Sequence, residues 1–165
     1  MPKVWGPYGN DINTDLLFAG KYTYLGSKPA DIIPRLLEDL DAEFALNVQT
    51  GDILVAGWNF GCGSSRNQPA VGFKALGMTV IAKSFSRIFY RAAINLGLLL
   101  IACPEAVDAY TPGARVDVDI EQSQVRINGV DYQFPPLDPY VQDIVRAGGL
   151  IEAIRAKRTA AQATS

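Results

Sequence analysis

The sequence predicts an α/β fold in which helices cover a parallel sheet and a small antiparallel β unit is added to this core. Between residues 52 and 102, continuous apolar runs alternate with helical patterns, which is typical of buried parallel strands joined by helices. After Pro112 the pattern changes to alternation of apolar and polar residues, which indicates antiparallel strands with one exposed face. A chain of 165 residues can bury one core. We therefore expect a single domain.

The central series begins with a strand at 52–57 and ends with a strand at 98–102. Between them we expect a helix at 67–76, a strand at 78–82 and a helix at 85–95. Right-handed crossovers place the segment that follows strand 52–57 at the carboxyl end of the sheet. Open α/β sheets bind their ligands at this end.

The flanking segments are shorter and less regular. Residues 3–5 predict a first strand, and residues 10–25 predict an irregular loop of a length that is often functional. We also expect weak helices at 34–40 and 42–47, antiparallel strands at 115–120, 124–127 and 131–134, and helices at 138–147 and 150–156. Residues 1–156 would form the domain, and the polar tail 157–165 is expected to be disordered.

Composition narrows the classes of function. The formal net charge of -2 gives no reason to expect a nucleic-acid partner. No apolar run approaches the roughly 20 residues of a membrane span, and the first residues lack the form of a signal peptide, so we expect a cytoplasmic protein.

The chain has no histidine, which excludes Ser-His and Cys-His catalytic pairs within it. Its two cysteines, Cys62 and Cys103, are too few for a Cys-ligated iron–sulfur cluster. Another chain would have to supply most ligands of any metal.

The segment 59–66, Asn-Phe-Gly-Cys-Gly-Ser-Ser-Arg, is the strongest signal for a site. It follows a predicted buried strand and precedes a predicted helix, where unpaired backbone amides and the helix dipole favour anions. Arg66 adds a guanidinium that can bind a carboxylate with two parallel hydrogen bonds. We therefore expect an acidic small molecule as the ligand.

Simpler interpretations remain open for each candidate residue. The segment could be a turn whose Ser65 caps the following helix, Asp15 could cap a turn, and Cys62 could be a small buried hydrophobe or a reactive thiol. Tyr22 and Tyr24 could pack their own loop. Lys83, Arg87 and Arg91 would share one face of a helix, as surface charges commonly do. The segment is not a nucleophile elbow or a phosphate-binding loop, because it lacks the residue patterns of both.

Taken together, these segments resemble the small subunit, or swivel domain, of the aconitase superfamily. Within it the similarity is greatest to the small subunits of 3-isopropylmalate dehydratase, homoaconitase and dimethylmalate dehydratase type. The resemblance covers about residues 2 to 155 and is specific, because several separate motifs match. The matching residues are 13–15, 51–57, 59–66, 74–77, 82–91 and 95–98.

The resemblance implies a three-layer β/β/α swivelling domain like the fourth domain of aconitase. It further implies a large subunit as partner, which carries a [4Fe–4S] cluster, while this chain provides no metal ligand. The cluster would act as a Lewis acid on a hydroxy-dicarboxylate substrate, from which water is removed and to which it is added back. Alone, the small subunit would be inactive and could self-associate through its uncovered docking face.

The resemblance also assigns roles to individual residues. Ser64 matches the general base that removes the proton next to a carboxylate. Ser65 and Arg66 match ligands of the substrate carboxylate. Thr14 and Asp15 match a pair that orients the catalytic groups.

Two departures from the family pattern carry information. The family usually has Glu-His and then Ala-Pro after Ser-Ser-Arg, whereas this chain has Asn67-Gln68-Pro69-Ala70. Homoaconitase-type loops place an arginine near the position of Tyr24 to pair with a third carboxylate of the substrate. Tyr24 is uncharged, and Lys21 is the only cation in the aromatic segment 20–25. We therefore expect Lys21, Tyr22 and Tyr24 to face an uncharged substrate group.

The leading hypothesis is the small subunit of a hydro-lyase that acts on 3-isopropylmalate or a methylated malate. One alternative is a homoaconitase-type subunit that acts on a tricarboxylate. Another is a binding module that retains the carboxylate pocket without turnover; Ser64 and Arg66 argue against it, whereas Asn67-Gln68 keeps it open. A free-standing hydrolase is disfavoured by the absence of histidine.

Overall fold

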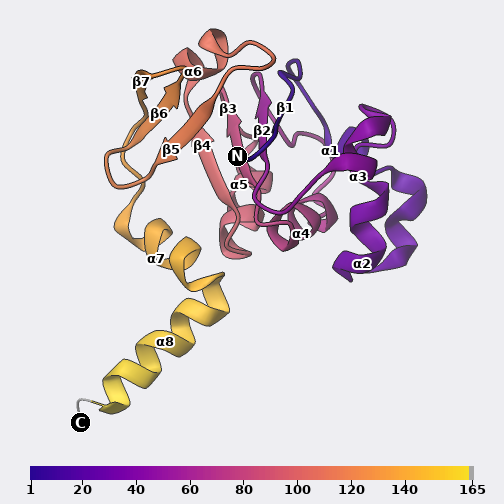
Figure 1. Cartoon of the computed structure of the whole chain (residues 1–165). Helices are drawn as coiled ribbons and strands as arrows, with labels where there is room; N and C mark the ends of the chain where they lie inside the picture. The colour runs from indigo at the N-terminus through magenta and orange to yellow at the C-terminus, as the bar shows by residue number, and fades with distance from the viewer. Residues whose placement is uncertain (164–165) are drawn as a thin grey trace.

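The computed structural model describes residues 1–163, which form two β-sheets with helices around them (Figure 1). The first sheet is parallel, with the strand order β1-β2-β3-β4, and the second is antiparallel, with the order β5-β6-β7. The parallel strands are β1 (Val4–Trp5), β2 (Ile53–Ala56), β3 (Thr79–Ala82) and β4 (Leu99–Ala102). The antiparallel strands are β5 (Val116–Asp119), β6 (Gln124–Ile127) and β7 (Val130–Gln133). The predicted fold class and every predicted strand are confirmed.

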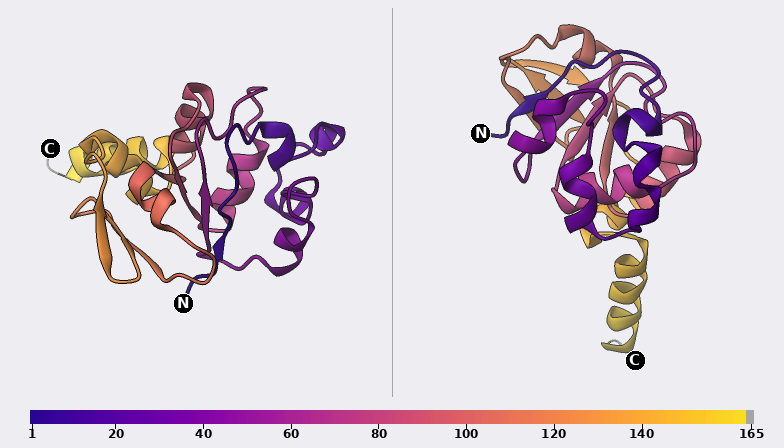
Figure 2. Two further views of the ribbon diagram at one scale, coloured as in Figure 1. Left: turned by 90° about the horizontal axis from the view of Figure 1, so that it is seen from above. Right: turned by 90° about the vertical axis from the view of Figure 1, so that its right-hand side faces the viewer.

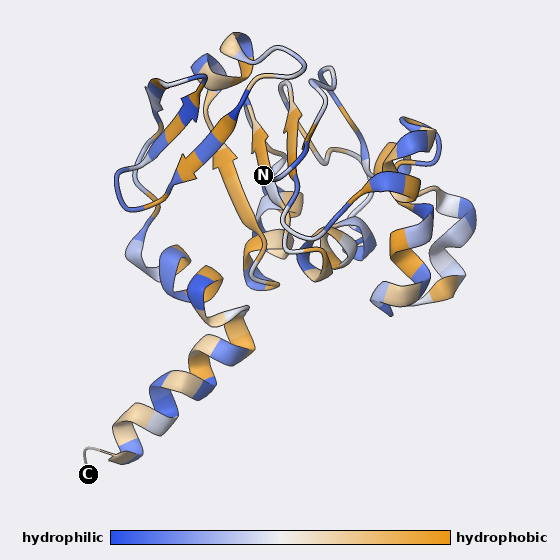
Figure 3. Cartoon of the chain, in the orientation of Figure 1, coloured by the Kyte–Doolittle hydropathy of each residue, from blue (hydrophilic) through white to orange (hydrophobic). Residues whose placement is uncertain are grey.

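The parallel sheet is the middle of three layers (Figure 2). Successive strand residues point to opposite faces of a sheet. Leu54 of β2 accordingly belongs to a core shared with α4 (Gln68–Ala75) and α5 (Arg87–Asn95). Its neighbour Val55 belongs to a second core shared with α6 (Pro104–Ala109) and the antiparallel sheet. Because both faces are covered, β2 is buried along its whole length, and the parallel strands are mostly apolar (Figure 3).

The amino-terminal third is more helical than its sequence predicts. Its elements are α1 (Thr14–Leu17), the 3-10 helix η1 (Gly20–Leu25), α2 (Pro29–Ile32), the 3-10 helix η2 (Ile33–Arg35) and α3 (Ala42–Asn47). The prediction of an irregular loop at 10–25 is therefore wrong for most of its length. The predicted helix at 34–40 is also wrong, since Leu36 is extended and Leu37 has a φ of 57°. Both leucines are fully buried, so tertiary packing prevails over local helical preference.

The carboxyl-terminal part consists of α7 (Pro139–Ala147) and α8 (Leu150–Ala163), which projects from the body of the molecule (Figure 1). Gly148 ends α7 in the left-handed conformation, as glycine commonly does after a helix. The prediction of disorder from residue 157 differs from the structure, because α8 continues to Ala163. Residues 157–163 include three alanines, one lysine, one arginine and one glutamine, all of which favour helix even when exposed. Residues 164 and 165 lie outside the described residues. No helix within residues 1–163 is long and apolar enough to span a bilayer.

Asp52 fastens the edge strand β1 to the rest of the sheet. Its side chain is buried, and one carboxylate oxygen accepts a hydrogen bond from the Lys3 backbone amide at 2.9 Å. The other accepts from the Trp5 indole at 3.0 Å and from the Gln49 amide at 2.9 Å. Because β1 has only two residues, this carboxylate adds to the attachment that its pairing with β2 and the packing of Trp5 on Phe44 provide.

We expect Asp52→Asn to lower the free energy of unfolding by about 2 kcal/mol, because an amide nitrogen would face one of the three N–H donors and leave it unpaired. Chemical denaturation of the full chain measures this change. Asp117→Asn is the matched control, because it removes only an exposed ion pair with Arg115, which contributes about 0–1 kcal/mol. Equal losses in both variants would contradict the assigned role of Asp52.

Candidate functional site

The chain segments that follow β1, β2 and β3 continue side by side beyond the sheet. The amide of Gly61 donates to the carbonyl of Ile12 at 2.8 Å, and the amide of Thr14 donates to the carbonyl of Cys62 at 2.9 Å. Phe60 is paired in the same way with the segment around Phe85. The three connecting segments therefore keep the order of their strands. This pairing brings the Asn-Thr-Asp segment of residues 13–15 next to the glycine-serine segment.

Gly61 is required by the geometry of this pairing. Its φ is 82°, in the left-handed region that disfavours other residues. A Cβ atom added at Gly61 would also overlap the ring of Phe89, which packs edge-on against Phe60. Gly63 has a φ of 96° and lies against Asn13 and Thr14. The two glycines thus allow the backbone to turn tightly between α1 and α5.

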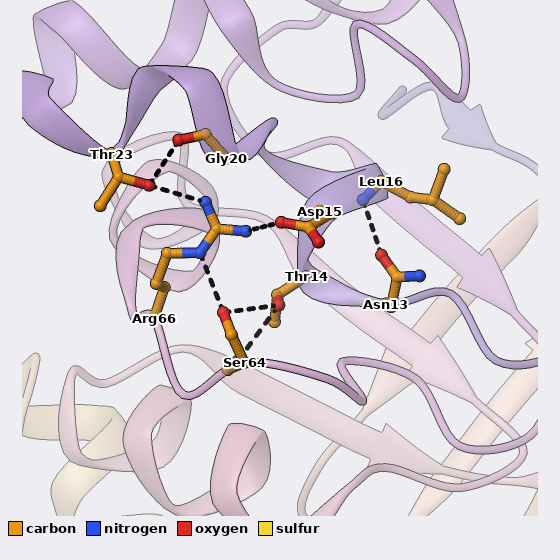
Figure 4. Close-up of polar contacts among 8 residues, drawn as sticks. All are labelled: Asn13, Thr14, Asp15, Leu16, Gly20, Thr23, Ser64 and Arg66. Carbon is orange, nitrogen blue, oxygen red and sulfur yellow. Dashed lines mark hydrogen bonds and ion pairs between the residues drawn. The ribbon is translucent and has the colours of Figure 1, made fainter.

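Arg66 joins three segments of the chain (Figure 4). Its Nε donates to Ser64 Oγ at 2.9 Å, and one Nη donates to Thr23 Oγ1 at 3.0 Å. The other Nη forms an ion pair with the carboxylate of Asp15. The Arg66 side chain is 16% exposed, whereas the Asp15 side chain is 71% exposed. The guanidinium is thus held in one orientation beside the Ser64 hydroxyl, with its anionic partner at the surface.

Ser64 and Thr14 share a second set of hydrogen bonds. Thr14 is buried, and its hydroxyl lies 3.1 Å from the backbone carbonyl of Ser64 and 3.2 Å from Ser64 Oγ. A hydroxyl carries one proton and can direct it to either acceptor. Thr14 can therefore donate to the carbonyl while Ser64 is neutral, or to Oγ if that oxygen becomes negative. Ser64 Oγ has two potential donors, Arg66 and Thr14.

Ser65 lines a narrow recess beside Ser64, together with three residues of α5. The recess is lined by Thr14, Ser64, Ser65, Arg66, Ile88, Phe89 and Ala92.

The alternative in which Ser65 caps the next helix is wrong, because α4 begins at Gln68 and Asn67 occupies the cap position without a side-chain hydrogen bond. The positive group that contacts Ser64 Oγ directly is the Arg66 guanidinium. Asp15 caps no turn either, since Asn13 is the cap of α1.

The remaining predicted ligand residues lie on η1 and are not joined to Ser64 or Arg66 by any hydrogen bond or ion pair described within residues 1–163. Lys21 pairs with Glu38 at 3.5 Å, and that carboxylate raises the pKa of the Lys21 ammonium. Tyr22 packs its ring against Phe18. Tyr24 is 80% exposed and free to meet a ligand or another chain.

Two residues of the site region were not predicted as such from sequence. Thr23 accepts from Arg66, and Gln68 donates through Nε2 to the carbonyls of Thr23 and Gly26. The sequence signals only that Gln68 departs from the family pattern. Lys83, predicted to lie on a helix with Arg87 and Arg91, instead precedes α5 and forms an ion pair with Asp108 at 2.6 Å.

Metal-ligating side chains are not gathered anywhere in residues 1–163: no group of three His, Cys, Asp or Glu residues could hold an ion. Cys62 and Cys103 are both free thiols. Burial raises the pKa of the Cys103 thiol, which keeps it protonated and unreactive near neutral pH.

The fold agrees with comparisons to known proteins. The model of the Aconitase C-terminal domain matches residues 10–106. The 3-isopropylmalate dehydratase small subunit of Caldicellulosiruptor bescii is 46% identical over 151 residues, which cover 90% of each chain. The small subunit 1 of the same enzyme from Archaeoglobus fulgidus is 40% identical over 161 residues, covering 96% of this chain and 98% of the relative.

A solved structure extends this similarity to three dimensions. The crystal structure of a 3-isopropylmalate dehydratase protein from Methanocaldococcus jannaschii superposes with a TM-score of 0.89 at 32% identity, covering 99% of this chain and 98% of that one. The chain therefore belongs to the aconitase C-terminal domain family, in the branch of the 3-isopropylmalate dehydratase small subunits.

We expect Gly61→Ala to destabilise the chain by about 2–4 kcal/mol, through the left-handed backbone and the overlap with Phe89. Gly113→Ala is the control, because Gly113 also has a positive φ, 92°, but has open space around it. It should cost about 1 kcal/mol. Thermal unfolding of both variants separates the steric effect from the conformational one, and identical shifts would contradict the packing argument.

Proposed function

We propose that this chain is the small subunit of a heteromeric hydro-lyase that dehydrates and rehydrates an alkyl-substituted malate, namely 3-isopropylmalate or a methylated malate. One observation carries the proposal: the Ser64 hydroxyl lies between the Arg66 guanidinium and the Thr14 hydroxyl, in a chain related to 3-isopropylmalate dehydratase small subunits. Each part of the site has a task in that reaction.

Ser64 is the proposed general base. Removing a proton from the carbon next to a carboxylate requires a strong base, and a serine serves only if its alkoxide is stabilised. Arg66 Nε already points a donor at Ser64 Oγ, and Thr14 can turn its proton from the Ser64 carbonyl to Oγ. Donors fixed in place before charge develops stabilise it without reorganisation. The Ser64 hydroxyl would first release its proton to solvent; the alkoxide would then take the carbon-bound proton and return to a neutral hydroxyl.

Arg66 is the proposed ligand of the substrate carboxylate, with the Ser65 hydroxyl beside it. Its two Nη groups now contact Thr23 and the exposed Asp15. A carboxylate from the substrate would approach the same planar guanidinium, to which it can bind with two hydrogen bonds. Asp15 and Thr14 would orient Arg66 and Ser64, respectively.

A large subunit is the proposed partner and would hold the [4Fe–4S] cluster, because the described residues offer no group of metal ligands. The cluster, when bound, supplies Lewis-acid activation of the substrate hydroxyl and carboxylate. Large apolar side chains are exposed at the site end of the sheet and on η1: Ile88 at 61%, Trp58 at 48% and Tyr24 at 80%. The partner would cover them, and the isolated chain would self-associate through them.

The substrate side group is proposed to be uncharged. Tyr24 carries no charge, and Lys21 directs its ammonium to Glu38. A third substrate carboxylate in a partly dry pocket would lack a partner, which disfavours the homoaconitase-type alternative. The binding-module alternative is disfavoured because the hydrogen bonds to Ser64 exceed what carboxylate binding alone requires.

We expect Ser64→Ala to reduce kcat on 3-isopropylmalate by at least about 10³-fold, because the proton acceptor is lost. The assay uses the anaerobically co-purified complex and follows the ultraviolet absorbance of the unsaturated acid. Thr159→Ala, which removes a hydroxyl on the projecting α8, is the control and should retain full activity. A cluster-loaded wild-type complex that turns over no malate would favour the binding module.

We expect Tyr24→Arg to shift the ratio of kcat/KM values toward homocitrate over 3-isopropylmalate by about tenfold or more, because the new cation can pair with the third carboxylate. Tyr24→Phe should leave this ratio unchanged. Competing assays of the two substrates with each complex give the ratio. Efficient homocitrate turnover by the wild type would show that the argument from Tyr24 is wrong.

A further inference from the structure

Gln68 is a buried residue whose amide contacts the segment 20–26 that contains η1. It is the first residue of α4 and is 5% exposed. Its Nε2 donates to the carbonyl of Thr23 at 3.1 Å and to that of Gly26 at 2.6 Å. Its Oε1 is buried and, within residues 1–163, accepts no hydrogen bond. Both donor protons are thus used on one loop, while the acceptor is unused.

This arrangement shows what determines the position of the amide. A buried acceptor without a donor is unfavourable. The hydrogen bonding of Oε1 therefore does not explain the orientation of the Gln68 amide. Rotating the amide by half a turn would bring Oε1 against two carbonyl oxygens, which repel it. Gln68 donates to both loop carbonyls; that of Thr23 also accepts from the Gly26 amide at 3.4 Å.

Apolar contacts anchor the loop only in part, through the half-buried Tyr22 and Leu25, which pack against the core. Polar contacts hold the remainder. No residue of η1 is buried. Apart from Gln68, the main link from the loop to the site is the hydrogen bond from Arg66 to Thr23 Oγ1, and the same hydroxyl donates to the Gly20 carbonyl. Segments with few buried apolar contacts open at low free-energy cost. Gln68 and Arg66 therefore hold Thr23 by its backbone and its side chain, respectively.

We infer that Gln68 is a positioning residue that fixes loop 20–26 beside Arg66 and thereby sets how tightly the enzyme binds the side group of its substrate. The fixing of the loop follows from the contacts of Gln68. Its consequence for the substrate rests on the proposed function, because that function places the side group against this loop. The two parts are tested separately.

The first test is hydrogen exchange of the full chain followed by mass spectrometry. Gln68→Met removes both donors at similar size and should speed exchange in peptides covering 20–28 by about tenfold, with peptides covering β2 unchanged. Gln142→Met is the control, because Gln142 lies on α7 and its side chain donates to one backbone carbonyl, that of Leu137. It should leave residues 20–28 unchanged. Unaltered exchange of 20–28 in Gln68→Met would overturn the inference, whatever the enzyme does.

The second test uses Gln68→Glu in the co-purified complex. A buried carboxylic acid can donate one hydrogen bond when protonated, but its ionised form repels both carbonyls. We therefore expect KM for 3-isopropylmalate near the wild-type value at low pH and about tenfold higher at high pH, with kcat within about twofold of wild type. Gln142→Glu should follow the wild-type profile.

The outcomes separate the two proposals. A KM ratio between Gln68→Glu and wild type that does not change with pH would overturn the substrate part of the inference. A wild-type complex inactive on every malate would overturn both the proposed function and this substrate part, while hydrogen exchange still decides whether Gln68 fixes the loop.

Discussion

The site depends on a short parallel pairing between residues 12–14 and 61–63, formed after strands β1 and β2 have ended. Thr14 and Ser64 are 50 positions apart in the chain, and their hydroxyls lie 3.2 Å apart because these two backbones run side by side. The pairing is possible only because Gly61 and Gly63 adopt positive φ values. The loops after β1 and β2 thus remain paired in the same order as their strands. This pairing fixes the positions of the groups that would carry the chemistry.

Arg66 adds a positive charge beside this pairing, and all of its guanidinium nitrogens have hydrogen-bond partners. A guanidinium that is mostly removed from solvent is costly unless its donors find acceptors, and here they reach Ser64, Thr23 and Asp15. A lysine would present one point charge and could not hold three partners in a plane. The planar fork therefore fixes the Ser64 hydroxyl and loop 20–26 together. The exposed position of Asp15 leaves one side of the fork accessible from solvent.

Sequence reasoning predicted the strands and the two central helices because their apolar periodicity is local and their strands are buried on both faces. It did not predict α1, η1, α2 or α6, since helices of four to six residues carry few periods, although α3, of six residues, was expected. For the site, the glycine-serine segment and Arg66 were identified, and the resemblance added Thr14 and Asp15. Thr23 and Gln68 were not assigned to it, because their contacts run to backbone carbonyls and to a residue distant in the chain. Such contacts leave no pattern in the order of residues.

The molecule therefore holds its two functional parts by different forces. The groups around Ser64 are built on paired backbone and on a core that includes Phe60 and Phe89, both buried. Loop 20–26 has no buried residue in η1; the half-buried Tyr22 and Leu25 pack against the core, and hydrogen bonds from Arg66 and Gln68 hold Thr23 and Gly26. Substitutions in the loop can then change what it recognises while the apolar core stays intact, whereas changes at Gly61 disturb both. Under the proposed function, a fold divided in this way can keep one reaction and vary the substrate, with the uncharged Tyr24 at the variable position.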